Sequence, residues 1–379
     1  MCSPGSGPSG ADGNLRLAIV GTRGIPARYG GFETFAEELS TRLVRHGHEV
    51  TVYCRSPHPD PEYLGVRLVY LSTIRHKYLD TIAHTAVSTL HLLRHASSFD
   101  TALYCNGANA VFTWIPRVAR IPVALNVDGL ERKRKKWNAV ARAWYLMSEW
   151  LSTFCPTETV SDAAHIAAYY QQRYGKRTRF IAYGAETGPV ATREAPDRLG
   201  LEPGEYFLYV TRMEPENNPL LVREAFEQVD TAKKLVLVGD APYAQDYIRR
   251  VRDTRDPRVL LPGAIYGQGY HELQSHCYAY IHATEVGGTH PALIEAMGRG
   301  ALVFYLDTPE NAEVAGGAGI PFTHENLAAQ ITSALGWPEE ERARLRSAAA
   351  SRVRERYSWD AVTSAYERLL ESMTGGPSR

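Results

Sequence analysis

The stretches Tyr209-Val-Thr-Arg-Met-Glu-Pro-Glu-Asn-Asn-Pro219 and Glu285-Val-Gly-Gly-Thr-His-Pro-Ala-Leu-Ile-Glu295 are the most informative parts of this chain. The first predicts a strand whose end carries Arg212 into a loop and then a helix. The second predicts a glycine loop that leads into a helix, with Glu295 one turn in. Arginine, glycine amides and a helix N-terminus favour a diphosphate, and a carboxylate beyond them suits ribose hydroxyls. These strand–loop–helix units predict an α/β fold with a nucleotide diphosphate site in its second half.

Apolar strands alternate with helical stretches along the rest of the chain, which is typical of parallel, doubly wound sheets. We expect strands at residues 15–21, 49–54, 66–71, 101–105, 122–127, 206–210, 234–238, 259–261, 278–282 and 301–305. We expect helices at residues 32–45, 219–228, 269–276, 291–299, 338–356 and 359–373. Two such domains that face each other form a cleft at the carboxyl ends of their strands, where open α/β sheets bind ligands.

The length of 379 residues suits two domains better than one core. Residues 1–13 are rich in Gly, Ser and Pro and predict a disordered tail. We expect a first domain at residues 14–190 and a second, nucleotide-binding domain at residues 204–357. Residues 358–379 are expected to form a final helix and tail.

Composition argues against several kinds of partner. Lys plus Arg equals Asp plus Glu, at 42 each, so no global charge favours nucleic acid. The five cysteines are scattered without a Cys-x-x-Cys pair, which argues against a disulfide framework or zinc site and fits a reducing, cytoplasmic compartment. No apolar run reaches the roughly 18 residues of a membrane-spanning helix. No Asp-x-Asp motif or metal-ligand spacing occurs, so we expect no metal.

Another glycine-rich stretch, Val20-Gly-Thr-Arg-Gly-Ile-Pro-Ala-Arg-Tyr-Gly-Gly-Phe-Glu33, lies between the first expected strand and helix. This is the phosphate-binding position of a Rossmann unit, although the pattern is not Gly-x-Gly-x-x-Gly. Gly30 and Gly31 would let backbone amides approach a donor phosphate or an acceptor. From the residues alone, a long glycine turn without a ligand is an equal alternative.

These motifs resemble those of glycosyltransferase family 4. The two stretches quoted first are similar to the family's pattern Gly-Arg-x-x-Pro-Glu-Lys-Asn followed by Glu-x7-Glu. The motif at residues 20–33 and the segment 126–131 resemble a bacterial branch that contains rhamnosyltransferases of polysaccharide assembly. The likeness covers nearly the whole chain. It implies a GT-B fold, in which an acceptor-side domain and a nucleotide-sugar-binding domain, both Rossmann-like, face each other across a cleft and the C-terminal helix crosses back.

The resemblance also implies an activity. It predicts a retaining glycosyltransferase that moves a sugar, with rhamnose as one candidate, from a nucleotide diphosphate donor to a hydroxyl of a glycan, lipid-linked or small-molecule acceptor, without a cofactor. It assigns catalysis to Asp128, Arg212 and Glu295. It assigns donor binding to both glycine loops and their neighbours, namely Gly30, Gly31, Arg212, Asn217, Glu285, Gly287, Gly288, Thr289 and Glu295.

Two positions depart from the family's pattern. The usual lysine is Asn217, so Arg212 with backbone dipoles, or another base, must neutralise the phosphate. Glu285 and Glu295 are ten positions apart instead of eight, so the counterpart of the first glutamate is Gly287. From the residues alone, Arg212 could also be a surface ion pair, and Glu285 an exposed loop acid.

Three further residues lie where the predicted cleft should be. Asp128 ends an expected strand, at a position where many relatives have a histidine, and it could orient the acceptor hydroxyl or the donor sugar. Asp128-Gly129 as a simple turn pair is the alternative. His282 and His290 flank the second glycine loop. A lone histidine is more often structural, but two beside this loop favour sugar contact.

Five consecutive bases precede an aromatic-rich segment that contains Trp137 and Trp144. Such a run is usually a solvated face, but it would also attract an anionic membrane or a lipid diphosphate. With the resemblance, it predicts peripheral binding to the inner face of the membrane, near a lipid-linked acceptor. The bases are Arg132, Lys133, Arg134, Lys135 and Lys136.

Two other functions stay open. An NADP-dependent oxidoreductase would use Arg55, at the end of the second strand, for the 2′-phosphate, and it predicts nicotinamide binding to the first domain. A non-catalytic sugar-nucleotide-binding protein would fit the missing lysine and the altered glutamate spacing. A turnover assay separates this last function from a transferase.

Overall fold

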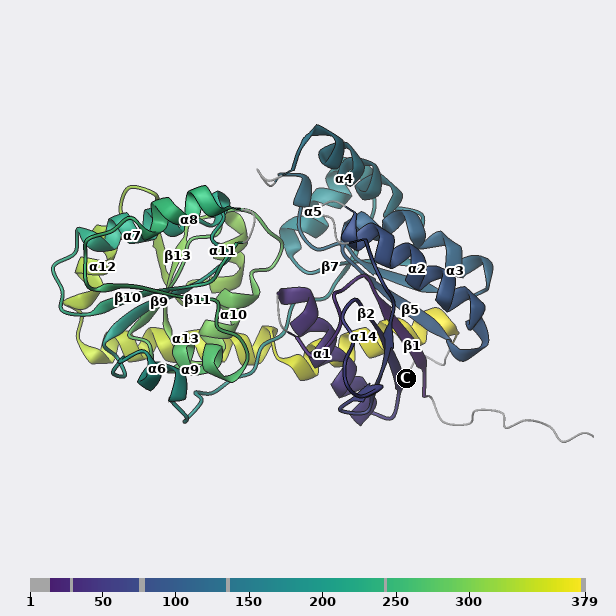
Figure 1. The fold of residues 1–379 in the computed structure, drawn as a ribbon, viewed down its shortest axis with the longest axis horizontal. Coiled ribbons are helices and arrows are strands. Elements are labelled where there is room, and N and C mark those ends of the chain that lie inside the picture. The colour runs from purple at the N-terminus through teal and green to yellow at the C-terminus, as the bar shows by residue number, and fades with distance from the viewer. Residues whose placement is uncertain (1–13, 28–29, 75–78, 134–136, 242–243, 376–379) are drawn as a thin grey trace, which may run out of the picture.

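The computed structural model of the protein describes residues 14–27, 30–74, 79–133, 137–241 and 244–375. The chain forms two α/β domains side by side, each with a central sheet covered by helices on both faces (Figure 1). The expected fold, two doubly wound Rossmann-like domains that face each other across a cleft, is therefore confirmed.

The first domain has an eight-stranded sheet in the order β3-β4-β2-β1-β5-β6-β7-β8, in which only the β3–β4 pair is antiparallel. Its inner strands are apolar because helices bury both faces of the sheet. The strands are β1 (Arg16–Val20), β2 (Glu49–Cys54), β3 (Glu62–Tyr63), β4 (Val66–Tyr70), β5 (Thr101–Cys105), β6 (Val123–Asn126), β7 (Glu158–Ser161) and β8 (Arg179–Phe180). The helices are α1 (Gly31–Arg45), α2 (Asp80–Arg94), α3 (Trp114–Val118), α4 (Ala139–Leu151) and α5 (Ala164–Tyr174), with short 3-10 turns η1 (Ala96–Ser98), η2 (Gly107–Phe112) and η3 (Glu131–Lys133).

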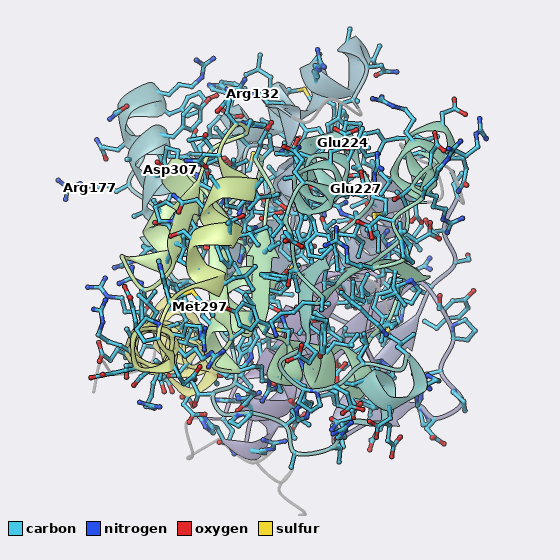
Figure 2. The ribbon with its side chains drawn as sticks, turned by 90° about the vertical axis from the view of Figure 1, so that its left-hand side faces the viewer. Arg132, Arg177, Glu224, Glu227, Met297 and Asp307 are labelled. Carbon is cyan, nitrogen blue, oxygen red and sulfur yellow. The ribbon has the colours of Figure 1, made fainter. Side chains whose placement is uncertain are left out.

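The second domain has a six-stranded parallel sheet in the order β11-β10-β9-β12-β13-β14. Figure 2 views the molecule from the side of this domain. The strands are β9 (Tyr206–Val210), β10 (Lys234–Val238), β11 (Val259–Gly263), β12 (Ala279–His282), β13 (Leu302–Leu306) and β14 (Ile320–Phe322). The helices are α6 (Glu194–Arg198), α7 (Pro219–Glu227), α8 (Gln245–Arg252), α9 (Gln268–His276), α10 (Pro291–Gly298), α11 (Pro309–Ala315), α12 (Leu327–Leu335) and α13 (Glu339–Arg356), with the turn η4 (Pro215–Asn217).

The last helix, α14 (Trp359–Thr374), crosses back onto the first domain and packs along α1 (Figure 1). Phe35 of α1 packs against the rings of Trp359 and Tyr366, whose centroids lie 6.4 and 5.3 Å away. The Tyr366 hydroxyl also accepts a hydrogen bond from Asn126 Nδ2 at 2.9 Å. This contact ties the end of the chain to strand β6, beside the cleft.

Four strands of the structure are absent from the sequence expectations, among them β8, which is only two residues long. Strand β7 has the sequence ETVS, which is short and mostly polar. Strand β14 contains a proline and lies at the edge of its sheet, where a missing donor is tolerated. Strand β3 is only two residues long. Each lacks the apolar run that makes the inner strands recognisable.

In both sheets, the order in which successive strands are added reverses beside a central strand. β1 lies between β2 and β5, and β9 lies between β10 and β12. Such a switch point leaves a crevice outside the carboxyl ends of the strands. The loops that follow β1, β6, β9 and β12 all line the cleft.

Candidate functional site

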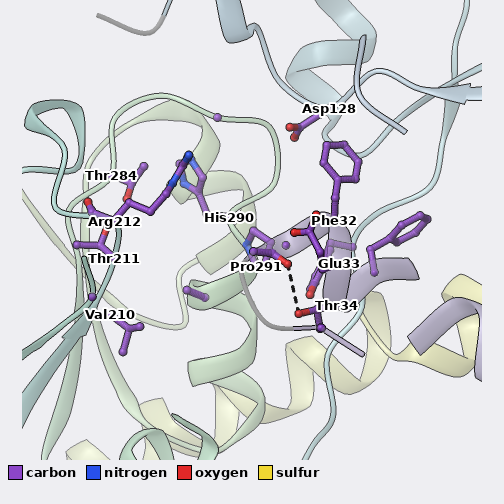
Figure 3. Close-up of a pocket in the computed structure, with 18 of the residues that line it drawn as sticks. Phe32, Glu33, Thr34, Asp128, Val210, Thr211, Arg212, Thr284, His290 and Pro291 are labelled. Atoms are coloured by element: carbon purple, nitrogen blue, oxygen red, sulfur yellow. Dashed lines mark hydrogen bonds between the residues drawn. The ribbon is translucent and has the colours of Figure 1, made fainter. Parts of the chain in front are cut away.

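The cleft between the domains encloses about 1080 Å³ and is lined from both sides. Figure 3 shows Arg212 and His290 on one wall, with Phe32, Glu33 and Asp128 facing them from the other. This volume lies at the upper end of the range of small-molecule pockets, which suits a ligand with several parts.

Arg212 follows strand β9 and lines the second-domain wall. Its guanidinium is partly exposed, and its Nη1 lies 3.9 Å from Glu214 Oε2, at the limit of an ion pair. Among the described residues that line the cleft, it is the only Lys or Arg from this domain. Asn217 Nδ2 donates a 2.7 Å hydrogen bond to the Arg212 carbonyl, so Asn217 shapes the loop that presents the arginine.

The glycine loop brings Gly287, Gly288 and Thr289 to the cleft, directly before helix α10. Backbone N–H groups at a helix N-terminus favour an anion, as the sequence predicts for this loop. His290 precedes the helix, and its Nδ1 lies 2.5 Å from Asn311 Oδ1, which fixes the ring. The loop and Arg212 therefore lie on the same wall, as a diphosphate site requires.

Glu295 lies one turn into α10 and lines the cleft. Its two oxygens accept hydrogen bonds from the hydroxyls of Tyr183, at 3.1 Å, and Tyr270, at 2.5 Å. Burial raises the pKa of this carboxyl, while the two tyrosines act in the opposite direction. Each carboxylate oxygen can accept a second hydrogen bond, so the tyrosines orient Glu295 and leave it able to accept from ribose hydroxyls.

Asp128 lines the first-domain wall just after β6. Its backbone adopts the left-handed conformation, with φ of 58°, and its N–H donates to Asn126 Oδ1 at 3.0 Å. The following Gly129 touches the opposite domain, because an added Cβ there would lie 2.3 Å from both Gly287 C and Gly288 N. The Asp128 loop and the glycine loop are thus in backbone contact across the cleft.

Gly30 and Gly31, at the start of α1, also line the cleft. An added Cβ on Gly31 would lie 3.1 Å from Pro291 Cγ, so this loop also reaches the second domain. Glu33 lines the cleft, is largely buried and accepts a 2.9 Å hydrogen bond from Arg23 N. Burial raises the pKa of Glu33.

The structure places Glu285 apart from the other donor-site candidates, outside the lining of the cleft. Its Oε1 accepts a 3.0 Å hydrogen bond from Asn218 Nδ2 and lies 2.7 Å from His324 Nε2. The carboxylate therefore fixes the loop before the glycines. Spacing in the sequence could not show that its side chain turns away from the cleft.

Of the five consecutive bases, Arg132 turns inward. Its Nε bonds Glu149 Oε2 at 3.0 Å and its Nη2 bonds the Tyr169 hydroxyl at 2.7 Å. The side chain of Lys133 and the residues Arg134, Lys135 and Lys136 lie outside the described part of the chain. The guanidinium of Arg132 is thus bonded to other side chains of the first domain, although the residue lies near the top of the molecule in Figure 2.

Arg55, the residue that an NADP site would need, is nearly buried and pairs with Asp80 at 2.8 Å. Its Nη2 also donates to Thr81 Oγ1 at 3.2 Å. Burial lowers the pKa of Arg55, and Asp80 opposes this effect. Arg55 lines the cleft, but its guanidinium is already paired within the first domain.

Sequence reasoning missed Asp162, which follows the unexpected strand β7. It is buried, lines the cleft and contacts the glycine loop of the other domain.

His282 ends β12 and also lines the cleft. Its side chain is 3% exposed, and neither ring nitrogen has a hydrogen-bond partner among the described residues. Burial, and secondly His290, hold the pKa of His282 well below its usual value.

Within the described ranges, no group of three or more His, Cys, Asp or Glu side chains is arranged to hold a metal ion. No helix in the same residues has the length and apolar character needed to cross a bilayer.

Comparison with solved structures supports the fold. Anabaena Alr3699/HepE, in complex with UDP and glucose, has a TM-score of 0.78 at 16% identity, covering 95% of this chain and 100% of that chain. Sucrose-phosphate synthase from Thermosynechococcus elongatus has a TM-score of 0.78 at 19% identity, covering 95% and 99%. WaaG, a glycosyltransferase involved in lipopolysaccharide biosynthesis, has a TM-score of 0.71 at 16% identity, covering 95% and 100%.

Two family models match successive parts of the chain. Glycosyltransferase Family 4 matches residues 29–187, and Glycosyl transferases group 1 matches residues 204–336. No curated protein matches the chain. Together the two matches, which cover successive parts of the chain, and the shared fold support a glycosyltransferase with the GT-B fold.

Proposed function

We propose that this glycosyltransferase binds the diphosphate of its nucleotide-sugar donor on the second-domain wall and transfers the sugar, with retention, to a hydroxyl held at the first-domain wall. The observation that carries the proposal is that Arg212, the glycine loop and Glu295 line one shared cleft together with Asp128, which faces Arg212 from the opposite wall (Figure 3). Three structures of the Anabaena protein Alr3699/HepE hold UDP or UDP-glucose, which supports a uridine nucleotide as the first donor to try.

Each part of the donor meets a chemically suitable group in this arrangement. The planar guanidinium of Arg212 suits phosphate oxygens, and the amides of Gly287 to Thr289 add neutral donors at the start of α10. Glu295 would accept hydrogen bonds from the ribose. These groups would stabilise the negative charge that develops on the leaving diphosphate, which is the main catalytic contribution expected here.

Asp128 lies on the opposite wall, where it would orient the acceptor hydroxyl or the donor sugar. Retention and a rhamnosyl donor rest on the resemblance of the motif at residues 20–33 and the segment 126–131 to a branch that assembles polysaccharides. Few pocket residues set sugar preference, so rhamnose is one candidate among the sugars to be tested.

The test is a donor panel followed by a transfer assay. UDP, GDP, dTDP and NADP are screened by thermal stabilisation, in which a ligand at about 100 times its Kd adds about 2.7 kcal/mol to the free energy of unfolding. The matching sugar nucleotides are then tested for acceptor-dependent transfer, and NMR of the product shows the anomeric configuration. Stabilisation by NADP alone, or nucleotide binding without turnover, would contradict the proposal.

The acceptor we propose is a lipid-linked glycan, reached by peripheral binding to an anionic membrane. Helix α4 supports this proposal, because its outward face exposes Val140, Met147 and Trp150, at 78%, 40% and 54%. Arg142 on the same helix is exposed, and the only acidic residue of the helix, Glu149, is buried. An apolar helix face with basic flanks is typical of helices that lie in the membrane interface.

Flotation with anionic and neutral vesicles tests this acceptor. Each base near an anionic surface contributes about 1 kcal/mol, so we expect salt-sensitive binding to anionic vesicles only. Replacing Lys133, Arg134, Lys135 and Lys136 with Gln, or Trp150 with Ser, should weaken this binding. Leu64→Gln, which replaces another exposed apolar residue on the β3–β4 turn, should not. No binding at low salt, together with efficient transfer to a soluble acceptor, would favour a small-molecule acceptor instead.

A further inference from the structure

The loop after β7 places a carboxylate of the first domain on the glycine loop of the second. Asp162 Oδ2 accepts a hydrogen bond from Thr289 N at 3.1 Å, and the Asp162 carbonyl accepts one from Thr289 Oγ1. Asp162 is only 9% exposed and lines the cleft. One of the amides expected to bind the donor diphosphate is therefore already bonded to a carboxyl group that the chain itself supplies.

This carboxylate is poorly satisfied where it lies. Its Oδ1 is buried and has no hydrogen-bond partner among the described residues. Burial, and then the nearby charge of Asp128, raise the pKa of Asp162 well above its usual value. An added Cβ on Gly288 would lie 2.5 Å from this oxygen, so the carboxylate and the loop are in close contact. An unsatisfied buried oxygen costs free energy, which makes the contact weaker than a fully bonded one.

A second contact ties the same segment to the second domain at a different place. Glu313 of α11 accepts hydrogen bonds from Ala164 N, at 2.7 Å, and His165 N, at 3.2 Å. A carboxylate is favourable there because these amides begin helix α5. This contact also joins the domains, but it does not involve the glycine loop. Glu313 therefore provides a matched control for any effect of domain opening.

We propose that Asp162 is a displaceable occupant of the diphosphate site, which holds the Thr289 amide while the donor is absent and yields it to the donor's diphosphate. The inference rests on the proposed function, because it assumes that the diphosphate binds this loop. A diphosphate offers more acceptor oxygens than a carboxylate and also meets Arg212, so it displaces Asp162. After transfer, the returning carboxylate competes with the nucleoside diphosphate product and promotes its release.

Asp162 acts in this account through the loop and is a positioning residue. The experiment is isothermal titration of the full-length protein with inorganic pyrophosphate and with UDP. We expect Asp162→Ala to bind both ligands about tenfold more tightly than the wild type, because a charge-assisted competitor of the Thr289 amide is gone. Asp162→Asn should show a smaller gain, since its amide oxygen still accepts the hydrogen bond without the charge. In turnover assays, inhibition by the product UDP should strengthen in the same order.

Three results would overturn the proposal. The first is unchanged or weaker binding by the Asp162 variants, with Asp162→Asn deciding the question if the alanine variant does not fold. The second is equal tightening in Glu313→Gln, which would assign the effect to domain opening. The third is no binding of pyrophosphate or UDP by either wild type or variants, which would also remove the diphosphate from this loop. If the wild type binds these ligands and the Asp162 variants bind them with the same affinity, only the role of Asp162 is contradicted. The proposed function is then unaffected.

Discussion

Replacing Arg212 with alanine tests the donor site most sharply, because no other Lys or Arg of the second domain lines the described cleft. The side chain is 38% exposed and its ion pair with Glu214, at 3.9 Å, is long. Exposed pairs contribute about 0–1 kcal/mol to stability, so Arg212→Ala should fold normally. Any large effect on ligand binding then reports on the site itself.

The expected loss follows from the type of contact. A hydrogen bond to a charged group contributes about 1.5–3 kcal/mol, so Arg212→Ala should raise the Kd for the nucleoside diphosphate about 10- to 150-fold. Arg212→Lys keeps the charge without the planar fork and should recover only part of the affinity. Glycosyl transfer should fall at least as far, since the same contact stabilises the leaving diphosphate.

Isothermal titration with UDP measures the loss, and melting curves show whether each variant is folded. Arg177→Ala is the matched control, because this exposed arginine of the first domain projects into solvent away from the cleft (Figure 2). A folded Arg212→Ala protein with wild-type affinity would remove Arg212 from the site. A similar loss in Arg177→Ala would show that the effect is a general one of net charge.

Asp128→Asn should lower the transfer rate more than donor affinity, because Asp128 lies on the opposite wall, and an unchanged kcat in the folded variant would leave Asp128-Gly129 as a turn only. Gly129→Ala places a Cβ 2.3 Å from Gly287 C, so we expect lower donor affinity and a lower kcat with a near-normal Tm. Wild-type kinetics in this variant would show that the two loops separate freely. His282 has a pKa well below 6.5 in the folded state, so it contributes stability above pH 6.5 that is lost as the pH falls below that value. The Tm of His282→Gln should therefore fall less than the Tm of the wild type as the pH is lowered below 6.5. An equal fall in both proteins would contradict this prediction.

The fold could be predicted well because its inner strands are continuous apolar runs. Strands β9 and β10 have the bounds that the sequence predicts, since burial on both faces of a sheet leaves a clear signal. The short, polar β7 gives no such signal. Missing this strand also hid Asp162, whose position at the carboxyl end of a strand would otherwise have marked it as a cleft residue.

The site was predictable where a local motif fixes it and unpredictable where distant segments meet. Arg212 and Glu295 line the cleft. Arg212 is placed there by the end of its own strand, and Glu295 by the start of its own helix. The tyrosines that orient Glu295, Tyr183 and Tyr270, come from separate elements, and nothing local connects them with it. Glu285 fits a family motif in type but not in spacing, and its carboxylate bonds neighbouring loops instead.

The most direct test of the central claim is a crystal structure of the full-length protein with UDP, or with whichever nucleoside diphosphate stabilises it best. We expect the diphosphate to lie on the second-domain wall, with its oxygens bonded by Arg212 and by the amides of the loop at residues 287–289, and with the ribose at Glu295. A nucleotide bound instead to the glycine loop at residues 21–31 of the first domain, with Arg212 and Glu295 untouched, would contradict it.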